Sequence, residues 1–193
     1  MLSLCALAVA PQAQAQTTRY YRTPTDFDKE TLTIPVQASV GGRCGFASGA
    51  APGGTVNAGS IDTTGWSQQV PFTAQCTAPW RIAVSSLNGA LLTGAAPAAG
   101  YLSRAPYSVM LNVSADGGTV ASTCPVATID QTATSSTCNF NGTATTTNGL
   151  YVTRSFNLAG SYIQLSAPAF PGPEILAQGT YNDTLVVTIS PAT

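Results

Sequence analysis

Apolar residues occupy every second position in several segments of this chain. The clearest case is residues 32–40, where the apolar positions are Leu32, Ile34, Val36, Ala38 and Val40. A similar period of two recurs over 67–76, 80–86, 107–113 and 181–189. A β-strand places successive side chains on opposite faces, whereas an amphipathic α-helix needs a period of 3.6 residues. The alternation therefore predicts an all-β protein, and no segment has a convincing helical period.

Turn-forming sequences separate these segments. Asn88-Gly89 and Asp116-Gly117-Gly118 are typical of tight turns, and weaker strand patterns occur at 151–158 and 162–165. About seven short strands with such turns favour an antiparallel β-sandwich. The chain of 193 residues is long enough for one domain with a substantial core.

The composition excludes several kinds of chemistry. The chain has no histidine, only 8% of its residues are charged, and its net charge is −1. Ser-His-Asp catalysis and histidine-ligated zinc therefore cannot occur, and the few basic residues cannot neutralise a run of phosphates. No C-x-x-C motif is present. We expect neither an enzyme nor a cofactor-binding protein, and we expect no metal site and no nucleic-acid partner.

Two other residue classes could form a site. Asp62, Asp116 and Asp130 could supply paired carboxylates, but each has the sequence context of a turn, where aspartate is common. Trp66, Trp80, Tyr101 and Tyr107 could form a sugar-stacking platform. Aromatic residues in strands more often belong to the core.

The N-terminal residues predict export. Residues 1–15 combine an apolar run with the small-residue pattern Ala13-x-Ala15, which is typical of a signal peptide and its cleavage site. Residues 16–31 are a polar extension that contains many of the few charges. Residues 32–193 are then the single β-domain.

Four cysteines remain after removal of the signal peptide, namely Cys44, Cys76, Cys124 and Cys138. An even number in an exported chain predicts disulfides, and four cysteines allow three pairings. Nearness in sequence favours Cys44–Cys76 and Cys124–Cys138. The second pair would close a short loop in a Ser/Thr-rich stretch of low apolar content.

The two ends of the domain pose a structural problem. The last predicted strand, 181–189, is strongly apolar on one face, and a long apolar edge promotes aggregation unless another strand covers it. The alternating segment 32–40 of the same chain could fold back onto this strand. Alternatively, a strand from another subunit could be donated to it. Sequence patterns leave both possibilities open.

Several motifs resemble one family. The sequence of residues 179–189, GTYNDTLVVTI, is similar to the C-terminal G-x-Y-x-D signature of the spore coat protein U domain, with Gly179, Tyr181 and Asp183 at the motif positions. Cys44 after the first strand, and the segments 76–89 and 102–111, also resemble this family. The domain occurs in pilins of archaic, Csu-type chaperone–usher pili.

The resemblance implies an incomplete immunoglobulin-like antiparallel β-sandwich that is completed by a donor strand. The donor residues would be Leu32, Ile34, Val36, Ala38 and Val40, although Pro35 removes one ladder donor between them. The acceptor groove would include Leu185, Val187 and Ile189.

The same resemblance implies a structural subunit of a surface pilus, exported through the periplasm and supporting adhesion or biofilm formation. Its partners would be a periplasmic chaperone, an outer-membrane usher and neighbouring pilin subunits. The alternative is a self-complemented secreted β-sandwich that binds carbohydrate or forms a coat.

Overall fold

The structure is a computed structural model that describes residues 35–39, 41–94, 97–133, 136–170, 172 and 175–192. The chain divides into two units, Met1–Ser39 and Val40–Thr193. The predicted signal peptide, the polar extension and the donor positions Leu32, Ile34 and Val40 lie outside the described residues. All of the described strands belong to the second unit.

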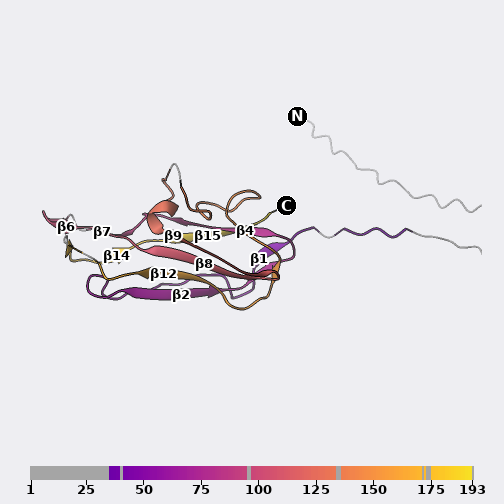
Figure 1. Ribbon diagram of the computed structural model, residues 1–193, viewed down its shortest axis with the longest axis horizontal. Helices are drawn as coiled ribbons and strands as arrows, with labels where there is room; N and C mark the ends of the chain where they lie inside the picture. Colours follow the sequence, from indigo (N-terminus) through magenta and orange to yellow (C-terminus); the bar gives the residue numbers. More distant parts are fainter. Residues whose placement is uncertain are drawn as a thin grey trace, which may run out of the picture. The chain divides into compact units, whose positions relative to one another are not determined.

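One layer of the fold is a four-stranded antiparallel sheet. It has the order β2 (Trp66–Phe72), β12 (Ser161–Ala167), β8 (Ser108–Ala115) and β9 (Gly118–Pro125). Strands β2, β12 and β8 run side by side along the length of the domain (Figure 1). The sheet has β2 at one edge and β9 at the other.

The second layer is built around β4 (Trp80–Ser86). It pairs antiparallel with β10 (Leu150–Val152) on one side and β15 (Leu185–Pro191) on the other. A smaller antiparallel sheet has the order β1 (Cys44–Phe46), β3 (Ala74–Cys76) and β11 (Ser155–Phe156).

Short strands form the opposite end of the domain (Figure 1). β5 (Leu91–Thr93) pairs antiparallel with both β7 (Arg104–Ala105) and β14 (Tyr181–Asn182). β6 (Tyr101–Leu102) pairs with β13 (Ile175–Leu176) in parallel. A single 3₁₀ turn, η1 (Val126–Ile129), follows β9, and the described residues contain no α-helix. The expectation of an all-β chain with antiparallel sheets, consistent with a β-sandwich, is confirmed.

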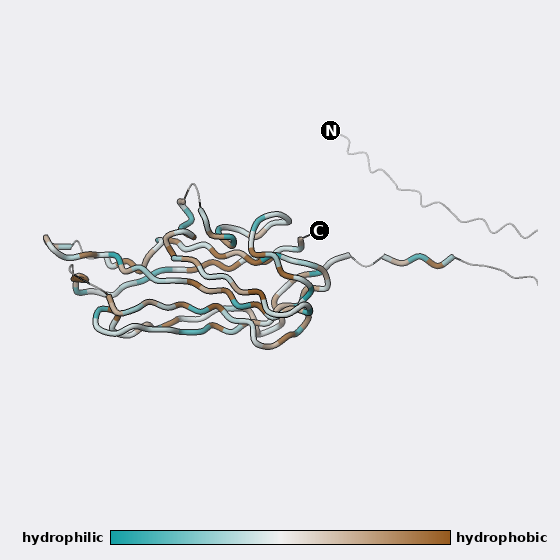
Figure 2. The backbone as a smooth tube through the Cα atoms, in the orientation of Figure 1, coloured by the Kyte–Doolittle hydropathy of each residue, from teal (hydrophilic) through white to brown (hydrophobic). Residues whose placement is uncertain are grey.

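The core follows from the alternation in sequence. In β8 every second residue is buried, whereas the intervening residues are half-exposed. On one face of β4, Trp80, Ile82 and Val84 are inaccessible to solvent, and on the other face Ala83 is buried between the half-buried Arg81 and Ser85. Hydrophobic segments alternate with more polar ones along the strands (Figure 2). Burying each large apolar side chain contributes about 1.5–3 kcal/mol, so these two strands anchor the sandwich.

Several predicted strands are interrupted. Segment 67–76 divides into β2 and β3 at Thr73, whose backbone instead pairs with Ala47 and Ala50. Segment 151–158 divides into β10 and β11, and 181–189 divides into β14 and β15. Residues 35–39 are exposed and belong to no strand. Period alone does not reveal where a strand leaves one sheet for another.

The stretch around Cys124 and Cys138 differs from its expected character. The sequence predicts a Ser/Thr-rich stretch with little apolar content, but Gly118–Pro125 forms strand β9 and the following segment contributes to the core. Val126, Ile129 and Phe140 are fully buried. A few apolar residues are enough to fix this segment in the fold because each of them packs against the main core.

Both disulfides favoured by nearness in sequence are present. Cys44–Cys76 joins β1 to β3, and Cys124–Cys138 joins the end of β9 to the following loop. The second closes a loop with a sequence separation of 14 residues, for which the chain-entropy model gives about 3 kcal/mol of stabilisation.

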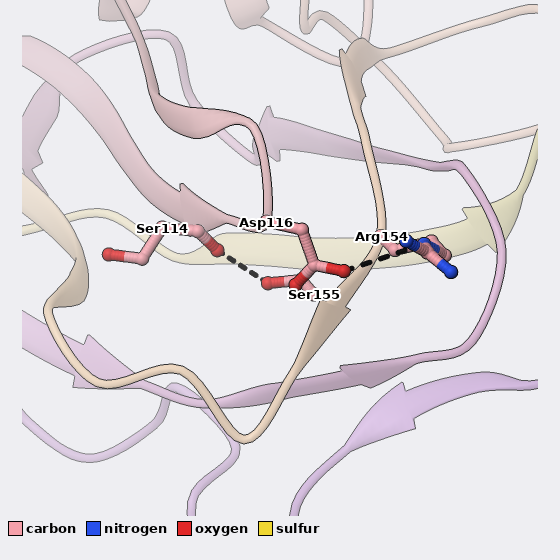
Figure 3. Close-up of polar contacts among 4 residues, drawn as sticks. All are labelled: Ser114, Asp116, Arg154 and Ser155. Atoms are coloured by element: carbon pink, nitrogen blue, oxygen red, sulfur yellow. Dashed lines mark hydrogen bonds and ion pairs between the residues drawn. The ribbon is translucent and has the colours of Figure 1, made fainter.

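Polar contacts tie β11 to the end of β8 (Figure 3). The hydroxyl of the buried Ser155 donates to the carbonyl oxygen of Ser114. Arg154 and Asp116 form an ion pair at 3.4 Å, and Asp116 N donates to Arg154 O at 2.8 Å. This cluster satisfies polar groups where the small sheet meets the four-stranded layer.

Candidate functional site

A groove with apolar side chains on both sides and polar residues at one end lies between the two layers. It has a volume of about 370 Å³ and is lined on one side by Trp66 and Val70 of β2 and Leu165 of β12. On the other side lie Leu185 and Val187 of β15. These side chains are partly buried and pack against the core. The loop before β2, including residues 52–56, closes part of the groove.

Strand β15 presents unpaired backbone groups along this groove. Leu87 N donates to Thr184 O at 2.9 Å, and Ala192 N donates to Pro79 O at 2.9 Å. Because backbone groups of successive residues in a strand point to opposite edges, the even-numbered residues of β15 face β4. The N–H and C=O groups of Leu185, Val187 and Ile189 therefore face the outer edge. No strand among the described residues pairs with that edge.

The opposite edge of β4 is covered, which makes the open edge of β15 distinctive. β10 pairs with the first residues of β4. Further along, Val84 N donates to Phe140 O at 2.8 Å, and Gly142 N donates to Val84 O at 3.1 Å. Gln131 N then donates to Ser86 O at 2.9 Å. Residues 131–142, within and just after the disulfide-closed loop, thus take the place of an edge strand on one side of β4, whereas no described strand pairs with the outer edge of β15.

The carboxylate of Asp183 fixes the start of β15. One oxygen accepts hydrogen bonds from Tyr107 OH at 2.6 Å and Ser86 Oγ at 2.7 Å. The other accepts from Thr184 N at 2.7 Å and Asn88 N at 3.1 Å. The start of β15, the turn after β4 and the residue preceding β8 are therefore joined at one end of the groove.

Tyr107 is held in its neutral form at this position. Burial raises the pKa of its phenol, and the hydrogen bond to the Asp183 carboxylate raises that pKa further. The ring packs against Trp66 with a centroid separation of 5.9 Å. Tyr107 thus connects the polar cluster to the apolar lining of the groove.

The two other motif residues have structural roles nearby. A side chain at Gly179 would overlap the hydroxyl of Thr93 in β5, so glycine leaves room for the Thr93 side chain here. Tyr181 OH donates to Ala177 O at 2.8 Å and to Leu102 O at 3.0 Å. Desolvation raises the pKa of Tyr181.

The predicted acceptor residues are brought together in β15. Leu185, Val187 and Ile189 are partly buried on one face and contact the core, whereas Val186 points away and is 53% exposed. Of the predicted donor residues, Val36 and Ala38 are described and exposed, Val36 at 89%.

The other candidate sites do not assemble. Trp80 is buried in the core and Tyr101 is exposed, so the four aromatic residues form no common platform. Asp130 accepts hydrogen bonds from Thr132 N and Thr132 Oγ1, both at 2.8 Å, as expected in a turn, and these bonds lower its pKa. Among the described residues, no three acidic or cysteine side chains are grouped as a metal site. No helix in the same residues has the length and apolar character needed to span a membrane.

The groove also includes residues that the sequence patterns do not assign to the acceptor groove, although Trp66 is a candidate for the aromatic platform. Trp66, Val70 and Leu165 form its second side, and Ser86 and Asn88 bind Asp183. The alternation that includes Val70 and Leu165 is visible in the sequence. Their position opposite β15 depends on the pairing of β2 with β12, which no local pattern specifies.

Comparisons with protein-family models, curated proteins and solved structures found no match.

Proposed function

We propose that this protein is a structural subunit of a chaperone–usher pilus and polymerises by accepting a β-strand from a neighbouring subunit. The observation that carries the proposal is the outer edge of β15. There, the backbone groups of Leu185, Val187 and Ile189 point away from β4 and pair with no described strand, and the side chains of Leu185 and Val187 line the groove.

An added strand would satisfy both features together. It would form ladder hydrogen bonds with β15, and its alternate side chains would enter the apolar groove. The segment 32–40 has the required pattern, because five apolar residues alternate with four others. Val36, the large apolar residue of this segment that the structure describes, is almost fully exposed. Burial of several such side chains provides a large gross gain before ordering costs.

The resemblance to spore coat protein U domains supports the remaining parts of the proposal. They are an immunoglobulin-like topology, export to the cell surface, transfer from a periplasmic chaperone to an outer-membrane usher, and a role in adhesion or biofilm formation. The protein would need no cofactor and no catalytic residue for this role. The immunoglobulin-like topology also explains why one strand position beside β15 would be left for a donor.

The test is deletion of residues 32–40 from the full chain, expressed with its own chaperone and usher. We expect surface fibres to disappear while the deleted subunit still reaches the periplasm in complex with the chaperone. A matched control replaces Thr33, Gln37 and Ser39 with alanine, which retains all five apolar donor residues. Normal fibres from the deletion variant would contradict the proposal.

A further inference from the structure

We propose that Pro35 determines the direction in which segment 32–40 can pair with β15, and that this direction favours a segment from a second copy of the chain over the chain's own segment. This inference rests on the proposed function. The physical basis is that strand direction decides which residues of the donor turn their backbone N–H and C=O groups toward β15.

Strand β15 sets the acceptor side of the pairing. Leu185, Val187 and Ile189 pack their apolar side chains against the core, where Leu185 and Val187 line the groove, and their backbone N–H and C=O groups point to the outer edge of β15. A donor must place its own apolar residues beside them. The donor residues that hydrogen-bond to β15 then depend on strand direction.

In an antiparallel pair, two residues that exchange hydrogen bonds lie directly opposite and share a face. Donor residues with apolar side chains in the groove would therefore also supply the ladder bonds. The N–H position of Pro35 would point to the edge of the donor away from β15, so no carbonyl of β15 would need it. Proline is thus tolerated in the antiparallel arrangement.

In a parallel pair, a residue that directs its backbone groups toward its partner lies opposite a residue whose groups point away. The outward-facing donor residues would then have to bond with β15, namely Thr33, Pro35, Gln37 and Ser39. Pro35 lacks an N–H group, so one of the four ladder donors would be missing and a carbonyl of β15 would remain unsatisfied. Parallel insertion is therefore selectively weakened.

The chain's own segment can fill the groove only in the parallel direction. β1 begins at Cys44, which pairs with Cys76, and Thr77 N donates to Arg43 O at 2.9 Å. Trp80, a few residues later, lies opposite Pro191 at the end of β15. The chain therefore enters the domain, at Arg43 and Cys44, close to the C-terminal end of β15.

The connection from Val40 to Cys44 is too short for the chain's own segment to insert in the antiparallel direction. From Leu185 to Pro191 a strand covers about 20 Å at about 3.3 Å per residue. The four steps from Val40 to Cys44 span at most about 14 Å. Val40 therefore cannot reach the Leu185 end, as an antiparallel insertion that fills the groove would require. A segment from a second copy has no such restriction.

The test compares variants of the full exported chain, refolded over a range of concentrations and separated into closed monomer and polymer by size-exclusion chromatography. For Pro35→Ala we expect about tenfold more closed monomer than for the wild type, because one ladder bond is restored to parallel self-insertion. The fraction of closed monomer should fall as the protein concentration rises in each variant, because closure is intramolecular and polymerisation is not.

A matched pair of variants isolates the edge of the strand from the presence of proline. Pro35→Ala combined with Gln37→Pro keeps proline in the outward-facing set and should polymerise like the wild type. Pro35→Ala combined with Ala38→Pro moves proline into the groove-facing set and should give closed monomer in place of polymer. Equal behaviour of these two double variants would overturn the role of Pro35. Polymerisation that persists without residues 32–40 would instead overturn the proposed function.

Discussion

At the scale of single residues, Asp183 ties together several elements at one end of the groove. Its carboxylate accepts four hydrogen bonds, two of them from the hydroxyls of Tyr107 and Ser86. We expect Asp183→Ala to lower the free energy of unfolding by about 2–3 kcal/mol, because buried donors lose a charged acceptor. Urea titration measures this change. The control Asp116→Ala removes an exposed ion pair and should cost less than about 1 kcal/mol. Equal losses in both variants would contradict the role assigned to Asp183.

Tyr107 gives a second prediction at this scale. Its pKa in the folded protein is raised by burial and by Asp183, so the folded protein keeps a proton that the unfolded chain loses above about pH 10. The stability linked to this proton is fully present below that pH and is lost as the pH rises further. Unfolding free energies measured from pH 8 to 11 should therefore decline less steeply for Tyr107→Phe. An identical decline in the two proteins would show that the phenol does not contribute.

At the scale of elements, the segment after β9 replaces an edge strand. Phe140 is fully buried, and its carbonyl accepts a hydrogen bond from Val84 of β4. We expect Phe140→Ala to cost about 3–5 kcal/mol through the cavity that it leaves. Thermal or urea unfolding measures this cost. The control Phe156→Ala removes an exposed ring and should have a much smaller effect.

The disulfide of this segment makes a separate contribution. Replacing Cys124 and Cys138 together with alanine releases a loop with a sequence separation of 14 residues. We expect a loss of about 3 kcal/mol, mainly because the unfolded chain gains freedom. The measurement is urea unfolding of the double variant beside the oxidised wild type. An unchanged midpoint would mean that the buried residues alone hold the segment.

At the scale of the whole molecule, assembly depends on which face of β15 is altered. Val187 lines the groove, whereas its neighbour Val186 is exposed on the other face. Threonine has nearly the shape of valine but adds a hydroxyl group. We expect Val187→Thr to weaken binding of a synthetic peptide of residues 30–42 by about tenfold, because that hydroxyl would be buried without a partner. Titration calorimetry with the full chain measures this affinity.

Val186→Thr is the matched control for the same experiment. The substitution is identical and lies one residue away, but its side chain remains in solvent. We expect peptide binding to be unchanged. Equal weakening by both substitutions would mean that the peptide does not occupy the groove face of β15.

Local sequence patterns predict individual strands better than their ends. β4 matches its predicted bounds because residues 80–86 form one uninterrupted strand. The predicted strand at 181–189 divides because Asp183 leaves the ladder and binds Ser86 and Tyr107, which are distant in sequence. The patterns do not reveal β9 because its residues are mostly small and exposed, and only Val120 and Cys124 pack against the core. Its strand conformation depends on pairing with β8.

Side-chain period and residue type are local properties, so the amino-acid sequence is enough to establish the all-β class, the apolar faces of β4, β8 and β15, and the exclusion of histidine chemistry. Nearness in sequence also favours the observed disulfide pairing, since nearby cysteines close short loops. Three features become visible only in the folded chain: the loop after β9 covers one edge of β4, no described strand covers the outer edge of β15, and Trp66, Val70 and Leu165 lie across the groove from it. These features depend on contacts between residues far apart in the chain, which no local period specifies.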